Sequence, residues 1–171
     1  MLRKFLVLAL ASAAFSAGAQ LIPDIHIDWK ENEAPPPPPL RTRNLVPIDV
    51  AGTSLRFGVD PESISIGSDG VVRYVVVATS NSGAVNGIYE GLKCNSGEVK
   101  VYARHNPDSG WVPAGNSEWR DVYSIPNTRY SLAIARSGAC RQRAANVSPA
   151  QILQDLRLPA DMRFETQGMI R

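Results

Sequence analysis

The distribution of apolar and polar residues in the middle of the chain predicts antiparallel strands. Ser63–Ile66 alternates, Gly67–Gly70 has the composition of a turn, and Val71–Thr79 is rich in β-branched residues. These segments are therefore a hairpin candidate. The consecutive residues Val75–Val77 are typical of a central strand whose two faces are both covered.

A second hairpin is expected immediately afterwards. Ile88–Cys94 would turn at Asn95–Gly97 into Glu98–Arg104. Strict alternation in the last segment places Val99, Val101 and Ala103 on one face and Glu98, Lys100, Tyr102 and Arg104 on the other. Further strands are predicted at Trp119–Ile125 and Tyr130–Arg136.

One helix is predicted near the C-terminus. Ser148 has the hydroxyl of an N-cap, Pro149 suits the first helical position, and Gln151 completes the pattern of a capping box. The helix would end near Arg157, with an apolar stripe formed by Ile152, Leu153 and Leu156. The predicted fold is α+β: an antiparallel β-rich single domain with a C-terminal helix and an extended proline-rich N-terminal arm.

The N-terminus has the organisation of a secretory signal. Arg3 and Lys4 precede the apolar run Phe5–Phe15, and small residues follow at 17–19. The run is too short for a transmembrane helix, which needs about 20 apolar residues. We expect cleavage after Ala19 and export to the periplasm, with secretion as the alternative. No cysteine follows that point to carry a lipid, so neither a lipid nor a transmembrane anchor is expected.

The next segment, Gln20–Leu40, is acidic and rich in proline. Pro35–Pro39 is an uninterrupted proline run, which favours an extended polyproline II conformation. We expect this arm to be disordered or docked at an edge, and its proline run to be a spacer more than a ligand for an aromatic groove. The expected organisation is a signal peptide at 1–19, an acidic proline-rich arm at 20–44 and one globular domain at 45–171.

The charge balance does not favour nucleic-acid binding. The chain has 18 basic and 16 acidic residues, and removal of Arg3 and Lys4 with the signal would leave equal numbers. The acidic excess lies before Lys93 and the basic excess after it. The two halves either face each other in the fold or form a basic surface for an anionic envelope component.

Chemistry-bearing residues are few. The pair Cys94 and Cys140 is expected to form a disulfide in an oxidising compartment. No cofactor is indicated and no metal site is expected. Asp24, His26 and Asp28 would share one face of an extended segment, but alternate residues lie about 6.6 Å apart, too far for easy convergence on one ion.

No familiar catalytic motif is present, so no catalytic residue is assigned. Arg73, Glu90 and Asp121 are the charged residues expected to be buried or to face a groove. If their strands are neighbours, Arg73 and Glu90 would form a structural pair. The functional alternative is a polar cleft in which Arg73 binds an anion and Glu90 acts as a general acid or base.

Two tryptophans flank a glycine-containing polar segment. Trp111 and Trp119 are interpreted first as packing or loop anchors. The alternatives are contact with a protein partner and stacking on a sugar ring.

The chain also resembles a known family, the cryptic neisserial protein-like family of small exported bacterial proteins. The resemblance spans most of the body, from Phe57 to Cys140, and implies an envelope protein with one uncharacterised domain and no catalytic residue to carry over. It rests on Phe57, Asp69–Tyr74, Ser82–Ala84, Asn86, Tyr89–Gly91, Cys94, Tyr102, Ala103, Trp111, Trp119, Asn127 and Cys140.

The functional hypothesis from the sequence is an exported cell-envelope protein that acts as a non-catalytic binding or structural module. Its partner would be an envelope protein or a cell-wall component, contacted through the Trp111–Tyr123 region, the basic half or the arm. The alternatives are an uncharacterised envelope enzyme acting on cell-wall or glycan material, using Glu90, Asp121 or His105, and a small hydrolase inhibitor.

Overall fold

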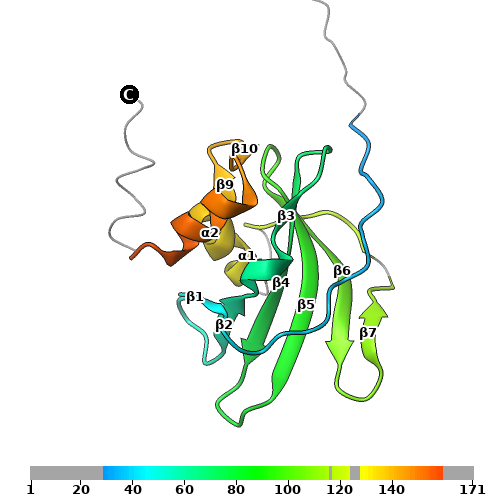
Figure 1. Ribbon diagram of the computed structural model, residues 1–171, viewed down its shortest axis with the longest axis vertical. Helices are drawn as coiled ribbons and strands as arrows, with labels where there is room; N and C mark the ends of the chain where they lie inside the picture. The colour runs from blue at the N-terminus through cyan, green and yellow to red at the C-terminus, as the bar shows by residue number, and fades with distance from the viewer. Residues whose placement is uncertain (1–28, 116, 124–127, 160–171) are drawn as a thin grey trace, which may run out of the picture.

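An antiparallel β-sheet organises the fold (Figure 1). The computed structural model describes residues 29–115, 117–123 and 128–159. Within these residues the strands follow the order β1-β2-β4-β5-β6-β7, with β3 paired to β4 and β8 paired to β6. The expected signal peptide, its cleavage site and the Asp24–Asp28 segment lie outside the described residues, as does part of the predicted strand at Trp119–Ile125.

The two predicted hairpins form the centre of the sheet. The Gly67–Gly70 turn connects β3 to β4, and Gly70 adopts φ +77°, a conformation that favours glycine. The strands that the structure describes are β1 (Val46–Ile48), β2 (Arg56–Val59), β3 (Ser65–Ile66), β4 (Val71–Thr79), β5 (Val85–Lys93), β6 (Glu98–Asn106), β7 (Gly110–Pro113), β8 (Arg120–Asp121), β9 (Cys140–Arg141) and β10 (Ala144–Ala145).

Helices cover one face of this sheet, which we call the helix face. The described helical segments are η1 (Pro61–Ser63), α1 (Arg129–Ile134), η3 (Ala135–Ala139) and α2 (Pro149–Arg157). The predicted C-terminal helix is confirmed, because the Ser148 hydroxyl accepts a hydrogen bond from the Gln151 amide at 3.1 Å. The predicted α+β class is therefore observed.

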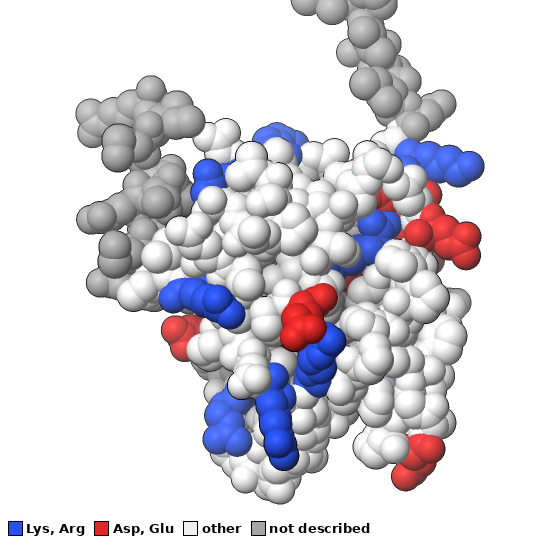
Figure 2. All heavy atoms as spheres, viewed as in Figure 1, with Lys and Arg blue, Asp and Glu red and all other residues white. Residues whose placement is uncertain are grey.

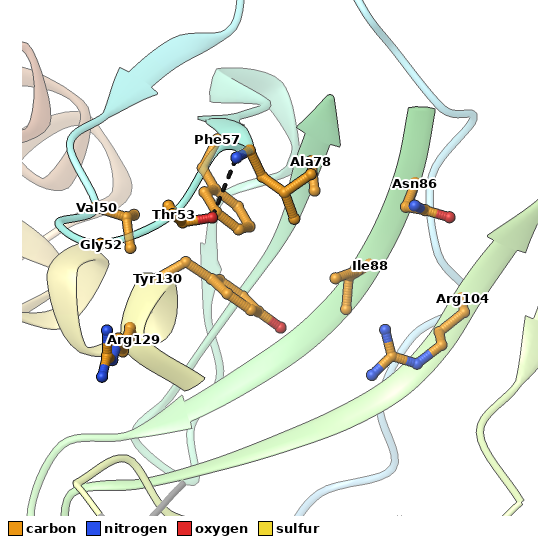
Figure 3. Close-up of a pocket in the computed structure, with 11 residues that line it drawn as sticks. Val50, Gly52, Thr53, Phe57, Ala78, Asn86, Ile88, Arg104, Arg129 and Tyr130 are labelled. Atoms are coloured by element: carbon orange, nitrogen blue, oxygen red, sulfur yellow. Dashed lines mark hydrogen bonds between the residues drawn. The ribbon is translucent and has the colours of Figure 1, made fainter. Parts of the chain in front are cut away.

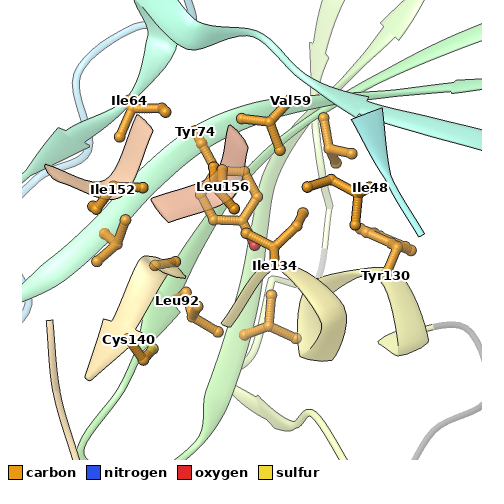
Figure 4. Packing of buried hydrophobic residues seen from close by; sticks show 14 of the residues in the cluster. Ile48, Val59, Ile64, Tyr74, Leu92, Tyr130, Ile134, Cys140, Ile152 and Leu156 are labelled. Atoms are coloured by element: carbon orange, nitrogen blue, oxygen red, sulfur yellow. The ribbon is translucent and has the colours of Figure 1, made fainter. Parts of the chain in front are cut away.

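The main hydrophobic core lies between the helix face and these helices (Figure 4). Tyr74 on β4 and Leu92 on β5 are packed beneath α1 and α2, where Ile134, Ile152 and Leu156 are almost fully buried. Of the three predicted apolar positions of α2, Ile152 and Leu156 are buried, and Leu153 is partly buried and packs against the same core. Burial of these side chains fixes the helical layer against the sheet.

A smaller core lies on the opposite side of the sheet, which we call the segment face. Its buried members are Val75, Val77, Tyr89 and Ala103. Consecutive valines on β4 therefore pack on opposite faces of the sheet, as expected for a central strand.

The N-terminal stretch Trp29–Leu40, which we call the docking segment, crosses the segment face without joining the sheet (Figure 1). It runs along β6 and then across the lower ends of β5 and β4 towards β1. Leu40 fits over Gly87, where an added Cβ would lie 2.5 Å from the leucine side chain. The described part of the expected arm thus lies against the sheet.

The disulfide between Cys94 and Cys140 is present. Cys94 follows β5 and Cys140 begins β9, so the bond ties the sheet to the segment that precedes α2. Asn146 is buried beside this connection and donates to the carbonyl of Gly138 at 2.7 Å and to the Asp155 carboxylate at 2.8 Å.

Three local predictions are wrong in whole or in part. Of the expected strand at Trp119–Ile125, only Arg120–Asp121 is a strand among the described residues, and Val122 and Tyr123 form a turn. The expected strand at Tyr130–Arg136 is helical, because Tyr130 and Ile134, one helical turn apart, both pack into the main core. The strict alternation predicted for β6 also fails. A bulge beside Tyr89 and Glu90 shifts the register so that Ala103 joins the segment face and Arg104 pairs with Ile88 of the helix face.

Candidate functional site

A pocket of about 590 Å³ lies on the helix face, between the sheet, the loop before β2 and the start of α1 (Figure 3). Its apolar lining includes Val50, Phe57, Ala78 and Ile88, which come from four separate places in the sequence. The size falls within the range of about 300–1,000 Å³ that is typical of small-molecule sites. We call it the basic pocket, after the two arginines at its margins.

Two guanidinium groups stand at the margins of this pocket. Arg104 comes from β6 and Arg129 is the first residue of α1; both are exposed, and they lie on opposite sides of Tyr130 and Ile88 (Figure 3). Among the described residues, neither forms an ion pair with a carboxylate. The pocket therefore offers positive charge on two sides of an apolar floor.

The β6 bulge is what brings Arg104 to the pocket. Under the alternation predicted from the sequence, its side chain would share a face with Tyr102. The bulge instead sets Arg104 opposite Ile88, which lines the pocket floor. A local irregularity of the sheet thus determines the charge of the site.

The wall of the pocket nearest α1 is a pair of stacked rings. Phe57 on β2 and Tyr130 on α1 have ring centroids 4.9 Å apart and planes inclined by 14°. This stacking joins β2 to α1. The Tyr130 hydroxyl points away from Phe57 and reaches a buried carboxylate.

That carboxylate belongs to Glu90, which is fully buried on the helix face. It accepts hydrogen bonds from the hydroxyls of Tyr74 at 2.6 Å, Ser131 at 2.8 Å and Tyr130 at 3.0 Å. Burial raises the pKa of Glu90, and the three hydroxyls and the charge of Arg104 offset only part of that effect. The same burial, together with the neighbouring carboxylate, raises the pKa of Tyr130 and of Tyr74.

A second, smaller pocket of about 240 Å³ adjoins the first. Glu90, Arg104, Arg120 and Tyr130 are among its lining residues, so the two pockets share Arg104 and Tyr130. Glu90 therefore lies at the wall of a cavity, but all its hydrogen bonds in the described structure are to hydroxyls of the protein itself.

The predicted pair between Arg73 and Glu90 is wrong. Arg73 is registered with Gly91, and Tyr74 with Glu90, so the two charged side chains occupy opposite faces. Arg73 instead forms a buried ion pair with Asp69 at 2.6 Å. Burial would raise the pKa of Asp69, but hydrogen bonds from Arg73 and from the amides of Asn32 and Val71, with the charge of Arg73, lower it overall.

Both tryptophans singled out in the sequence contact the docking segment. The Trp111 indole N–H donates to the carbonyl of Pro38 at 2.7 Å, and that of Trp119 donates to the Glu31 carboxylate at 3.0 Å. Lys100 and Tyr102 donate to the same carboxylate, each at 2.8 Å. Burial alone would raise the pKa of Glu31, but these three donors and the Lys100 charge lower it.

The remaining predicted residues do not assemble a site. Asp121 is exposed on β8, contrary to the expectation of a buried or groove-facing charge, and its carboxylate accepts from the Tyr123 amide. His105 packs edge-on against Trp111 near Gly87 on the segment face. Neither the basic pocket nor the smaller pocket beside it gathers two of Glu90, Asp121 and His105, which is what the enzyme hypothesis requires.

Among the described residues, no three His, Cys, Asp or Glu side chains are grouped so that they could hold a metal ion. In the same part of the chain, no helix has the length and apolar character needed to cross a membrane.

Sequence reasoning missed most of the residues that form the basic pocket. The sequence marks Phe57 only through the family resemblance, and its pattern predicts a strand that includes Tyr130 and begins just after Arg129. The usable signal was the spacing of Tyr130 and Ile134, one helical turn apart, which indicates a helix with its aromatic residue facing the core.

Comparison with protein families gives a match over most of the chain. Residues 24–157 match the model of the CNP1-like family, a range that includes the docking segment, the sheet and α2. Neither the curated proteins nor the solved structures contain a match to the chain. The match covers most of the chain and agrees with the resemblance noted in the sequence, and the chain therefore belongs to the CNP1-like family.

Proposed function

We propose that this protein is an exported component of the bacterial cell envelope that binds a ligand without transforming it. The proposed site is the basic pocket. The proposed ligand class is an amphiphilic anion, a molecule with a carboxylate or phosphate group on an apolar body. The observation that carries the proposal is the placement of two guanidinium groups, from Arg104 and Arg129, beside an apolar floor.

The chemistry of the lining supports this ligand class. Guanidinium groups bind carboxylate and phosphate oxygens through paired N–H donors. Phe57, Ile88 and Ala78 provide apolar surface whose burial by a ligand is favourable by about 25 cal/mol per Å². Figure 2 also shows basic side chains gathered towards the lower end of one face of the molecule, near the ends of the central strands.

Binding is favoured over catalysis by the environment of Glu90. A general acid or base must exchange a proton with a substrate within hydrogen-bond distance. The carboxylate of Glu90 is fully buried and is held by three hydroxyls that join β5 to β4 and α1. In this proposal its role is to position Tyr130 at the pocket wall.

Calorimetric titration with two ligands of equal chain length tests the ligand class. Decanoate should bind with saturation, and decyltrimethylammonium, which carries the opposite charge, should bind at least tenfold more weakly. Arg104→Gln and Arg129→Gln should each weaken decanoate binding about tenfold or more, since a hydrogen bond to a charged group contributes roughly 1.5–3 kcal/mol. Arg157→Gln is the matched control, because Arg157 is exposed on α2 and does not line the pocket.

Equal affinity for the two ligands would refute the assignment of an anion site. The same conclusion would follow if Arg104→Gln, Arg129→Gln and Arg157→Gln all bound decanoate as the unaltered protein does.

Export is tested separately by expressing the chain with its own N-terminus in a bacterium that has two membranes. The proposal expects the protein in the periplasmic fraction, with Gln20 as its first residue. A chain that retains Met1 in the cytoplasmic fraction would contradict this part of the proposal.

A further inference from the structure

The segment face has the chemistry of a peptide-binding surface, and the docking segment occupies it as a peptide ligand would. Residues 29–42 have no strand pairing with the sheet. They are held by side chains of the face that donate to carbonyl oxygens and to a carboxylate, as in the recognition of extended and proline-rich peptides. This surface lies on the opposite side of the sheet from the basic pocket.

Contacts along the whole docking segment define this recognition. Near the N-terminal end of the segment, the Trp29 indole donates to the Asp69 carbonyl at 2.9 Å, and the Lys93 ammonium lies 4.0 Å from the Trp29 ring centroid. The next contact is Glu31, whose carboxylate receives the three donors from Lys100, Tyr102 and Trp119.

At the other end of the segment, the proline run is recognised through its backbone. The Trp111 indole donates to the Pro38 carbonyl, and Leu40 fills the space above Gly87. Between the ends, the Asn32 amide donates to Asp69 and the Asn32 carbonyl accepts from Arg73. The face thus recognises an aromatic residue, an acidic residue and a proline run, in this order along the segment.

The connection between the docking segment and the sheet is short and exposed. Thr42, Arg43 and Asn44 are all exposed, and Asn44 adopts φ +57°. The main core lies on the other face of the sheet and contains no residue of the docking segment. Release of the segment would therefore uncover a recognition surface while the main core keeps its contacts.

We propose that two copies of this chain exchange their docking segments, each segment binding the segment face of the other copy. The occupant is identified by the structure, because Trp29–Leu40 is the peptide seen to fit this face and a second copy carries the same peptide. Exchange forms the same contacts in the dimer as in the monomer. The equilibrium between monomer and exchanged dimer therefore depends on protein concentration. The dimer competes with the tethered segment of the monomer, whose effective concentration is in the millimolar range.

Two complementary charge reversals test the exchange. In Glu31→Lys a cation on the segment faces Lys100, and in Lys100→Glu an anion on the face meets Glu31, so each variant has a repulsive contact in its monomer. Mixing the two variants allows each segment to bind the other chain's face with opposite charges paired. We expect a one-to-one heterodimer by native mass spectrometry, at concentrations where each variant alone is monomeric.

The double variant, with Glu31→Lys and Lys100→Glu in one chain, is the matched control. It restores the opposite charges within the monomer and should stay monomeric at the same concentration. A mixture of the two single variants that contains only monomers would overturn the proposal.

A second measurement uses the unaltered chain, so that the result does not depend on the folding of the variants. Unlabelled and ¹⁵N-labelled chains are refolded together at high concentration and treated with a carbodiimide, which joins a lysine amine to an adjacent carboxylate. Lys100 and Glu31 lie 2.8 Å apart and should be joined. If segments are exchanged, the dimer fraction should contain cross-linked peptide pairs with one labelled and one unlabelled peptide. The proposal would be contradicted if both peptides of every cross-linked pair came from chains with the same labelling.

Discussion

At the scale of single residues, the buried carboxyl of Glu90 connects the sheet to α1. Its three hydroxyl partners come from Tyr74 on β4 and from Tyr130 and Ser131 on α1. A buried hydroxyl that loses its acceptor costs more than the hydrogen bond contributed, because water cannot replace the missing partner. Glu90 therefore stabilises the position of α1, and with it the wall of the basic pocket.

Replacing Glu90 with leucine should destabilise the protein strongly. The substitution leaves three buried hydroxyls without their acceptor, at a cost of about 1–3 kcal/mol for each unsatisfied group. Denaturant unfolding should show a loss on the order of 3 kcal/mol or more. Glu90→Gln retains a carbonyl acceptor and should lose less. If Glu90→Leu were as stable as the unaltered protein, the hydroxyls would have found other partners and this account would be wrong.

Glu90 should also make stability depend on pH. Its pKa is raised in the folded state from the ordinary value of 4.5, so the folded protein holds the proton more tightly than the unfolded chain does. The resulting stabilisation is complete below pH 4.5 and is lost as the pH rises through the folded-state pKa. The unfolding free energy of the unaltered protein, minus that of Glu90→Gln, should therefore fall over that interval. A difference that is independent of pH would contradict the raised pKa.

Residue types alone indicated that Glu90 and Arg73 would be buried, and both are. They did not indicate the partners, since partners depend on which face of a strand each residue occupies. The register places Tyr74 opposite Glu90 and Gly91 opposite Arg73. One position along β4 therefore separates an ion pair on the segment face from a hydroxyl cluster on the helix face.

At the scale of elements, two carboxylates, those of Glu31 and Asp69, take part in holding the docking segment. Glu31 lies on the segment and is bound by the face, whereas Asp69 lies in the β3–β4 turn and binds both Arg73 and the Asn32 amide. Both carboxyls have lowered pKa values in the folded protein. The attachment of the segment therefore depends on two ionised groups.

Acid should loosen the docking segment before it disrupts the main core. The two lowered pKa values stabilise the folded state above the ordinary values of 4.5 for Glu31 and 3.8 for Asp69, and that stabilisation is lost as the pH falls through the folded-state values. The protection factor of the Asn32 amide, which corrects for slower intrinsic exchange at low pH, should fall in this range while amides of β4 stay protected. Glu31→Gln should weaken the attachment of the docking segment to the segment face even at neutral pH.

Glu33→Gln is the control for this prediction, since Glu33 is an exposed carboxylate on the same segment. It should leave exchange at Asn32 unchanged. Simultaneous loss of protection at Asn32 and in β4 would show that the segment and the sheet open as one unit.

Elements encoded by local pattern were predictable, and those that depend on distant contacts were not. The two central hairpins carry their own turn residues, and Ser148 caps α2 through its own hydroxyl. By contrast, α1 is short and gains its helical form from the packing of Tyr130 and Ile134 into the main core. The bulge in β6 was also not predictable, because the sequence around it has no turn residues that mark it.

At the scale of the whole molecule, the disulfide joins parts of the fold that the chain separates by 46 positions. Cys94 leaves the end of β5 and Cys140 begins β9, so the bond fixes the helical layer to the sheet. Closing a loop of this length restricts the unfolded chain, an effect of about 4 kcal/mol in the chain-entropy model. The bond therefore has its largest effect on the unfolded state.

Removing the disulfide should lower stability without changing the fold. The double variant Cys94→Ala and Cys140→Ala should lose about 2–5 kcal/mol in denaturant unfolding. Reductant should lower the stability of the unaltered protein by a similar amount and leave the variant unaffected. Equal stability of the variant and the oxidised protein would show that the two layers hold together through packing alone.

The hairpins, the capped C-terminal helix, the α+β class and the cysteine pair could be predicted from local patterns, because turn residues, β-branched runs, an N-cap and a pair of cysteines act through near neighbours or through simple pairing. The face that each side chain occupies, the partners of the buried charges and the path of the docking segment are set only when the chain folds. These features depend on strand register, on one bulge and on packing between residues far apart in the chain. Arg104 shows the physical reason most directly, since an extra residue in β6 moved its charge to the margin of the basic pocket.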